Sequence, residues 1–267
     1  MIDIHHHLLF GLDDGPRDIE MSLAMLEMAH ADGITHIVCT PHANHTWGYQ
    51  PEENAARLAQ ITQDITQDSK AGITLGLGCD FHLSYDNIQD ALANPHRYTL
   101  NGKNYLLVEF ADFTIPQTIS QTFYEMLLAG IVPIITHPER NPILGKEPQR
   151  LAEWIRQGCL VQVTAGSVMG RFGKQSQRVA EQLLQDRWVH FLATDAHDTV
   201  RRPPLLREAY NVVARNYGSD YAERLCVTNP HAAFHGESLP EQPEAAGIFE
   251  EAEPKRSLFS RIFSREE

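Results

Sequence analysis

MIDIHHHLLFGLDDGPRD (residues 1–18) holds the pattern from which the fold can be predicted. Its β-branched run Ile2–His5 has the length of a strand, and the helix-like segment Asp18–Ala31 follows after a turn. The same succession recurs along the chain. The further predicted strands are Ile34–Thr40, Ile73–Cys79, Tyr105–Phe110, Ile131–Thr136, Cys159–Thr164 and Val189–Thr194. The further predicted helices include Glu52–Ser69, Thr118–Ala129, Pro148–Gln157, Gln175–Gln185, Pro204–Tyr217 and Asp220–Leu225.

The regular alternation of strands and helices predicts a parallel sheet. Glycines such as Gly33, Gly130 and Gly158 stand between a helix and the next strand, where a left-handed residue is favoured. Seven strand–helix units in one chain favour an α/β fold with a distorted (β/α)7 barrel over a doubly wound sheet. We expect this domain to occupy residues 1–236. The Pro-, Glu- and Ala-rich residues 237–267 are expected to form a flexible tail.

Charge and composition narrow the classes of partner. The chain has 267 residues, with 22 Lys and Arg against 35 Asp and Glu, which gives a net charge of −13. A protein that binds nucleic acid or an anionic membrane is expected to have the opposite sign. No apolar run reaches the roughly 18 residues of a transmembrane helix, and the N-terminus does not resemble a signal peptide. The four cysteines lack paired spacing, so we expect a reducing, cytoplasmic location.

The ends of the predicted strands carry an unusual number of residues that can bind metals. The chain has 14 histidines, and several of them follow a strand directly. Such positions are His5-His6-His7, His42, Asp80, Glu109, His137, and Asp195 with His197. In a parallel α/β barrel these strand ends converge on one face, where active sites lie. The sequence therefore predicts a metal site at the mouth of the barrel.

Strand geometry narrows this prediction further. Side chains alternate across a strand, so His5 and His7 should point together while His6 points away. A mixture of histidine and carboxylate ligands suits Zn²⁺, Mn²⁺ or Fe better than Ca²⁺ or Mg²⁺. Taken singly, His42 or His137 could be an ordinary hydrogen-bonded histidine, and Asp13-Asp14-Gly15-Pro16 could be only a turn. A cysteine-dependent tyrosine phosphatase is excluded, because no cysteine is followed six residues later by arginine.

These motifs resemble the PHP (polymerase and histidinol phosphatase) superfamily. Within it, the chain resembles the manganese-dependent bacterial protein-tyrosine phosphatases of capsule and exopolysaccharide clusters, the CpsB/YwqE type. The opening MIDIHHHLLFGLDDGPRD is the most specific match, and ATDAHDTVRRPP (residues 193–204) also matches. The resemblance covers about residues 1–233 and implies a cytoplasmic hydrolase on a distorted barrel. Its implied partner is a phosphotyrosine-bearing protein, namely a bacterial tyrosine kinase of polysaccharide export.

The resemblance also implies roles for individual residues. It implies three divalent metal ions, Mn above all, with Fe or Zn as alternatives. The implied metal ligands are His5, His7, Asp14, His42, Asp80, Glu109, His137, Asp195 and His197. Arg140 and Arg202 match arginines that are expected to contact phosphate. Position 80 departs from the family, which usually has Glu at this bridging position, and the shorter Asp80 could alter metal spacing.

The residue types fit hydrolysis of a phosphate ester. Four carboxylates and five imidazoles around three divalent ions leave a positive centre that would attract a phosphomonoester. Metal ions lower the pKa of bound water toward about 7 and so supply a nucleophilic hydroxide. The alternative within the superfamily is a phosphatase of a small molecule such as histidinol phosphate or a sugar phosphate. An alternative of another class is a metal-binding regulatory protein without catalytic activity.

Overall fold

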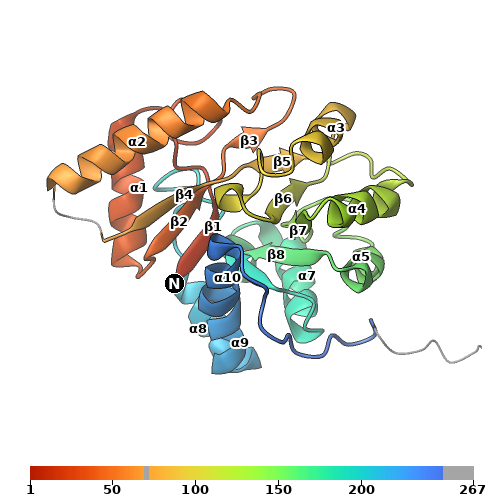
Figure 1. Cartoon of the computed structure of the whole chain (residues 1–267). Coiled ribbons are helices and arrows are strands. Elements are labelled where there is room, and N and C mark those ends of the chain that lie inside the picture. The colour runs from red at the N-terminus through yellow and green to blue at the C-terminus, as the bar shows by residue number, and fades with distance from the viewer. Residues whose placement is uncertain (69–71, 249–267) are drawn as a thin grey trace, which may run out of the picture.

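The computed structural model describes residues 1–68 and 72–248, and the strands in this part of the chain run parallel in two sheets (Figure 1). The first sheet has the order β1 (Ile2–His6), β2 (His36–Cys39) and β4 (Thr74–Leu77). The second has the order β3 (His42–Ala43), β5 (Asp80–His82), β6 (Tyr105–Glu109), β7 (Val132–Thr136), β8 (Leu160–Thr164) and β9 (Phe191–Ala193). Together they form the α/β barrel that the sequence predicts.

Hydrogen bonds join β1 to the segment that follows β9. The amide of His7 donates to the carbonyl of Ala196 at 2.9 Å, and the amide of Asp195 donates to the carbonyl of His5 at 2.9 Å. The buried carboxylate of Asp3 also accepts from the amide of Thr194 at 3.0 Å. These bonds hold β1 beside the end of β9, and the first and last strands of the barrel are therefore adjacent.

Three of the predicted strands are three residues shorter in the structure, and one of them is Val189–Thr194, which corresponds to β9. Ile34–Thr40 corresponds to β2 and Ile73–Cys79 to β4, and the chain then forms the additional short strands β3 and β5. Pro41 separates β2 from β3, since proline has no amide hydrogen to donate to a strand ladder. The barrel is distorted at this point, because β3 and β5 leave the first sheet and pair with the second.

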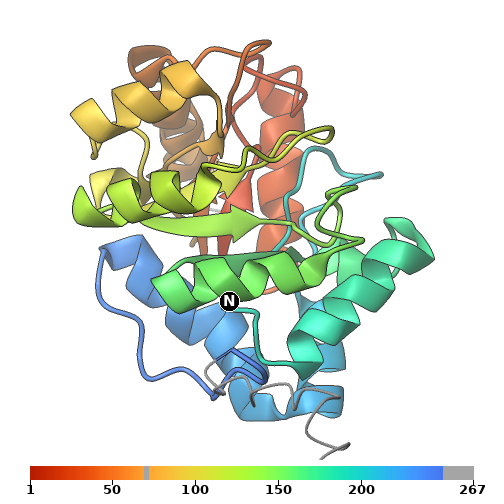
Figure 2. The same ribbon diagram turned by 90° about the vertical axis from the view of Figure 1, so that its right-hand side faces the viewer.

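Helices surround the sheets. The longer helices are α1 (Ile19–Ala31), α2 (Pro51–Asp68), α3 (Tyr85–Ala93), α4 (Ile119–Leu128), α7 (Gly173–Gln185) and α8 (Arg207–Tyr217). The shorter ones are η1 (Leu100–Gly102), η2 (Pro148–Arg150), α5 (Leu151–Gln157), α6 (Ala165–Val168), α9 (Ser219–Glu223), η3 (Arg224–Thr228) and α10 (Asn229–His235). Figure 2 shows α4 and α5 covering the outer face of the second sheet. Among the described residues, no helix is long and apolar enough to cross a membrane.

Apolar side chains fill the lower part of the barrel. Ile4, Leu107, Ile134 and Phe191 come from four strands and form one buried cluster. A larger cluster packs the helices against the outer faces of the sheets, where Trp154 stacks on Phe110 at 5.2 Å between ring centroids. The polar strand ends therefore lie above an apolar floor.

The region beyond residue 236 differs from the prediction of a flexible tail. Residues 237–248 lie against the barrel: the Trp188 indole donates to the carbonyl of Ala246 at 2.8 Å, and Ile248 is buried. Arg156 also donates to the carbonyl of Ile248 at 2.9 Å. Residues 249–267 of the predicted tail lie outside the described residues. We propose that the folded domain extends at least to residue 248.

Candidate metal centre

The strand ends bring nine residues into four overlapping groups of metal-competent side chains. In each group the nitrogen and oxygen atoms that could bind an ion lie within 4.8 Å of one another. The groups are His7, Asp14, His42 and His197; His5, His7 and Asp80; His5, His137 and Asp195; and His42, Asp80 and Glu109. These nine residues are the ones that the sequence predicts as ligands. Their role in binding metal remains a prediction, but their convergence is a feature of the fold.

Asp195 lies at the centre of the first cluster of ligand atoms. Its Oδ1 is 3.3 Å from Nε2 of His5 and 3.4 Å from Nε2 of His7. On the other side of His5, Oδ2 of Asp80 lies 3.7 Å from the same nitrogen. All four residues are buried. Two imidazoles at the end of β1 thus face a carboxylate on β5 and another that follows β9.

Asp80 also approaches a second cluster through His42. Its Oδ2 is 3.2 Å from Nδ1 of His42, whose ring lies 3.9 Å from Oε2 of Glu109. Nε2 of His137 is 3.7 Å from Oε1 of Glu109. Asp80 therefore lies between His5 and His42, which is the position that a carboxylate shared by two ions requires.

The third cluster lies nearest to solvent. Oδ1 of Asp14 is 3.4 Å from Nε2 of His42 and 3.2 Å from Nε2 of His197. The His7 ring packs against His197 with 3.8 Å between centroids. Asp14 is 45% exposed, whereas the other members are mostly buried, so this group opens toward the surface.

A register shift in β1 turns His5 and His7 toward this centre. Ile2 and Ile4 belong to the apolar cluster on the barrel floor, and strict alternation would place His6 on the same face. The pairing of β1 with β2 shifts between Asp3 and His6, as in a β-bulge. His6 consequently belongs to none of the metal-competent groups and is fully buried elsewhere.

Two supporting residues were not predicted from the sequence. Asp13 accepts a hydrogen bond from Nδ1 of His7 at 2.7 Å, and Oε1 of Gln162 lies 3.0 Å from Nδ1 of His5. Asp13 also accepts from the amide of His42 at 3.0 Å. Partners of this kind fix the orientation of a metal-binding histidine through its second ring nitrogen. The Asp13-Asp14 pair was visible in the sequence, whereas no local signal distinguishes Gln162.

Arg140 and Arg202 reach the centre through Asp195. Both guanidinium groups donate to Oδ2 of Asp195, the oxygen that points away from His5 and His7. The Arg140 guanidinium also lies over the Phe172 ring, 4.2 Å from its centroid. Gly166 makes room for that ring, since a Cβ there would be 2.7 Å from Cε2 of Phe172. Phe172 is a further positioning residue that sequence reasoning missed.

Several buried polar atoms of the centre have no hydrogen-bond donor or acceptor among the described residues. They are Oδ1 and Oδ2 of Asp80, Oδ1 of Asp195, Nδ1 of His42 and Nε2 of His197. Buried carboxylate oxygens without partners are costly, whereas metal coordination satisfies them. The donor set of histidines and carboxylates suits a transition metal. These residues therefore fit a bound metal cluster.

The electrostatics of the cluster are strongly coupled. Burial opposes the charged form of His5, but the carboxylates of Asp195 and Asp80 outweigh it and raise the pKa of His5 to about 9. Burial favours the neutral form of Asp80, yet His5 and His42 hold its pKa well below the ordinary value. Without metal, therefore, protons on imidazoles balance the carboxylates. Metal binding at these nitrogens would release those protons.

Two of the nine residues have strained backbones. His137 has φ of 33° and Asp195 has φ of 52°, in the left-handed region that non-glycine residues rarely adopt. The amide of His137 is fixed by the carbonyl of Gln162 at 2.9 Å, and that of Asp195 by His5. Such strain is commonly retained where a side chain must be aimed at a functional site.

An α/β barrel with clustered histidines and carboxylates at its mouth is the arrangement of a metal-dependent enzyme. The particular family follows from sequence: the family described as "Capsular polysaccharide synthesis, CpsB/CapC" matches residues 1–235, and the chain belongs to it. The resemblance drawn from the opening motif is thereby confirmed.

Named relatives agree with this assignment. The chain is 33% identical to tyrosine-protein phosphatase YwqE from Bacillus subtilis (strain 168), over 91% of this chain and 95% of the relative. It is 34% identical to the putative tyrosine-protein phosphatase CapC from Staphylococcus aureus, over 79% and 82%. A crystal structure from work on YwqE from Bacillus subtilis and CpsB from Streptococcus pneumoniae, described as unique metal-dependent tyrosine phosphatases, superimposes with a TM-score of 0.85. It is 30% identical and covers 92% of this chain and 99% of the other.

Proposed function

We propose that this chain is a metal-dependent phosphatase that hydrolyses phosphotyrosine on a protein. The observation that carries the proposal is the buried convergence of carboxylate oxygens and histidine nitrogens at the barrel mouth, several of which have no hydrogen-bond partner among the described residues. Its relatives YwqE and CapC are named as tyrosine-protein phosphatases, which favours this substrate over a small molecule. A bacterial tyrosine kinase involved in capsule or exopolysaccharide synthesis is the phosphoprotein that fits the family best.

The nine clustered residues would hold three divalent ions, with Mn²⁺ as the expected metal. His5, His7 and Asp195 would hold the first ion, Glu109 and His137 the second, and Asp14, His42 and His197 the third. Asp80 would be shared by the first and second, because its carboxylate belongs to one group with His5 and His7 and to another with Glu109. When bound, such ions supply a nucleophile at neutral pH by lowering the pKa of water, and they neutralise phosphate charge.

The arginines would orient the phosphate group. Guanidinium groups donate to phosphate oxygens in a fork that matches their geometry. Arg140 and Arg202 both point to the same oxygen of Asp195, so they converge on one point at the edge of the centre. Phe172 holds the Arg140 guanidinium from one side. A phosphate that reached this point would gain two charged donors without a large movement of either side chain.

The cysteines do not fit a role in this chemistry. Cys39, Cys79, Cys159 and Cys226 are unpaired and buried, and burial raises the pKa of each thiol above its ordinary value. A thiol kept neutral and out of reach of solvent is a poor nucleophile. Four unpaired thiols also fit the cytoplasmic location that we propose for this protein.

The first test of the proposal is the metal requirement. The purified protein with Mn²⁺ should hydrolyse a phosphotyrosine peptide, and a chelator should abolish this activity, because the proposed nucleophile depends on the bound ions. Iodoacetamide should leave the activity largely intact. Histidinol phosphate serves as the comparison substrate, and faster turnover of it would assign a small-molecule phosphatase instead. Loss of activity in step with alkylation of one thiol would contradict the mechanism.

A second test concerns Arg140. Arg140→Ala should lower kcat/KM for the phosphotyrosine peptide by about 100-fold or more, the scale of one lost charge-stabilising donor. Metal content should stay near that of the wild type, because Arg140 is not among the metal-competent groups. Arg140→Lys keeps the positive charge but loses the planar pair of N–H donors. Its kcat/KM should therefore lie between those of the wild type and Arg140→Ala. An unchanged kcat/KM in Arg140→Ala would remove this residue from the site.

A further inference from the structure

A pocket adjoins the metal centre on the side of Asp14 and His197. Its volume is about 420 Å³, and it lies between the turn after β1 and the loop that follows His197. Its lining includes Asp14, Arg17, His197, Asp198, Val200 and Arg201. The pocket is thus continuous with the group of His7, Asp14, His42 and His197, and it is large enough to receive a side chain of a bound peptide.

Arg17 and Arg201 supply the positive charge of this pocket. Both are exposed, and within residues 1–68 and 72–248 neither guanidinium has a hydrogen-bond or ion-pair partner. Arg140 and Arg202 differ, since both are engaged with Asp195. The two free arginines are therefore available to a ligand without first breaking a contact.

Two acidic side chains line the pocket, and both are already engaged: Asp14 faces His42 and His197 at 3.4 and 3.2 Å, and Asp198 binds its own loop. Oδ1 of Asp198 accepts from the amide of Val200 at 2.6 Å and from the amide of Arg201 at 2.5 Å. These bonds fix the loop in a tight turn and so present Arg201 in a defined direction. Asp198 acts as a support for the loop more than as a counter-ion for the arginine.

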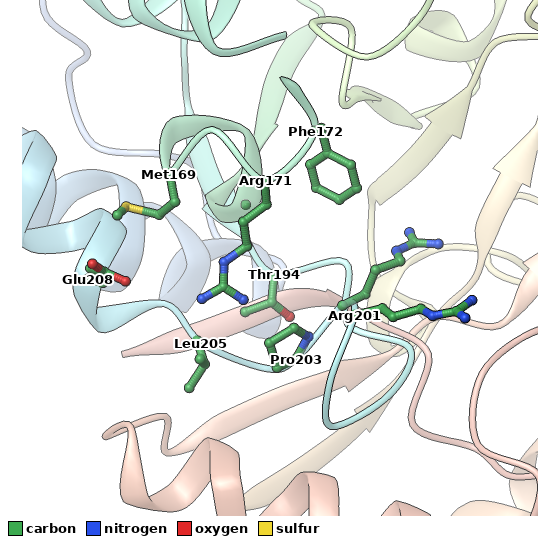
Figure 3. Close-up of a pocket in the computed structure, with 10 residues that line it drawn as sticks. Met169, Arg171, Phe172, Thr194, Arg201, Pro203, Leu205 and Glu208 are labelled. Carbon is green, nitrogen blue, oxygen red and sulfur yellow. The ribbon is translucent and has the colours of Figure 1, made fainter. Parts of the chain in front are cut away.

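The other pockets near the centre have a different character. Figure 3 shows the neighbouring pocket, where Arg171 lies on the other side of Pro203 from Arg201. Its accessible space is only about 10 Å³, which leaves no room for a side chain. Beside Glu109 lies a pocket of about 350 Å³ with Asp112 and the 87% exposed Phe113, and no lysine or arginine lines it. Arginines therefore line the two pockets on the side of Thr194 and His197, namely Arg17, Arg171, Arg201 and Arg202, and none lines the pocket beside Glu109.

We propose that the Arg17–Arg201 pocket binds a second anionic side chain of the substrate, next to the phosphotyrosine. The proposal rests on the proposed function, because it assigns a substrate preference to the same site. The ligand is a carboxylate or a phosphate, for which the fork of an arginine is well suited. On a chain of net charge −13, two free arginines beside the centre offset the repulsion that an acidic substrate segment meets. Because the arginines lie on one side of the centre, we expect an acidic residue to be preferred on one side of the phosphotyrosine and not on the other.

The test compares phosphotyrosine peptides that differ only in their flanking residues. One peptide carries two Asp residues before the phosphotyrosine, one carries them after it, and one carries Ala on both sides. Wild-type protein with Mn²⁺ should show about tenfold higher kcat/KM for one acidic peptide than for the Ala peptide, on the scale of two exposed ion pairs. The other acidic peptide should show no gain. Equal rates for all three peptides would overturn the proposal.

Variants connect the preference to the pocket. Arg17→Ala with Arg201→Ala should remove the preference and leave turnover of p-nitrophenyl phosphate unchanged, because that substrate has no second anionic group. Arg17→Glu with Arg201→Glu should reverse the preference. Arg215→Ala is the matched control, since Arg215 is an exposed arginine in the last turn of α8, far along the helix from the loop. A preference that survives in the double Ala variant would place the recognition elsewhere.

Further measurements distinguish a phosphate ligand from a carboxylate ligand, and failure of the proposed pocket from failure of the proposed function. A peptide with a second phosphotyrosine in place of the Asp pair distinguishes phosphate from carboxylate recognition, and either gain supports the pocket. Raising NaCl to 0.5 M should shrink the preference, because exposed pairs are screened. If wild-type protein hydrolyses neither peptide nor p-nitrophenyl phosphate with Mn²⁺, the proposed function fails, whereas hydrolysis without preference rejects only the pocket.

Discussion

Replacing His5 or His7 by Ala should abolish turnover and release metal. Each imidazole lies within 3.4 Å of the same oxygen of Asp195, so removing either one takes a ligand from the most buried cluster. Loss of a residue that merely supports a ligand costs about 10- to 100-fold in affinity or activity, and loss of the ligand itself should cost more than 100-fold. Metal per chain by mass spectrometry and kcat on a phosphotyrosine peptide are the measurements.

His6→Ala is the matched control in the same strand. The His6 ring is fully buried, and burial lowers its pKa to about 3, so it packs as a neutral group. The variant should lose stability by about 2 kcal/mol or more, as buried large-to-small changes do, and keep its metals. Thermal unfolding gives the stability and mass spectrometry the metal. Equal loss of metal in all three variants would show that β1 does not divide its histidines between two faces.

The direction in which the histidines face illustrates what sequence can and cannot predict. Alternation correctly predicts that His5 and His7 share a face and that His6 lies on the other. It does not say which face meets the centre, because Ile2 and Ile4 on the barrel floor would bring His6 inward by the same rule. The register shift between Asp3 and His6 decides the matter, and it depends on pairing with β2. Pairing of distant strands is not readable from a local pattern.

The remaining differences from prediction have similar causes. β3 and β5 are each too short to give a periodic signal, and they form because the chain crosses from one sheet to the other after Pro41 and Gly78. Gln162 contacts His5 across 157 positions of sequence, which only the closed barrel brings together. Residues 237–248 have the composition of a tail, yet their carbonyls meet Arg156 and Trp188 on the barrel surface. Amino-acid composition predicts whether a segment favours helix, strand or coil, but it does not predict that the segment packs against the rest of the domain.

Asp80→Asn should remove at least one metal ion and nearly all activity. The Asp80 carboxylate is buried, and neither of its oxygens has a hydrogen-bond partner among the described residues. One oxygen lies 3.7 Å from His5 and 3.2 Å from His42, so a single carboxylate serves two clusters. An amide offers one neutral oxygen and a donor nitrogen, and therefore cannot join two cations in the same way. Metal content after dialysis and kcat on a phosphotyrosine peptide give the answer.

Asp80→Glu and the wild type complete the comparison. Asp reaches one carbon less far than the Glu that the resemblance implies at this position, and metal–ligand distances tolerate only about 0.2 Å of misfit. The wild type should therefore lose one of its ions on dilution or mild chelation, while Asp80→Glu should retain activity and hold that ion more tightly. The rise in Tm on adding Mn²⁺ reports the same difference, because an ion that binds the folded state raises stability in proportion to the logarithm of its concentration over Kd. The rise in Tm should be smallest in Asp80→Asn. The Tm of this variant in the presence of chelator shows whether the substitution itself disturbs folding. Full occupancy and full activity in Asp80→Asn would mean that Asp80 is not a ligand.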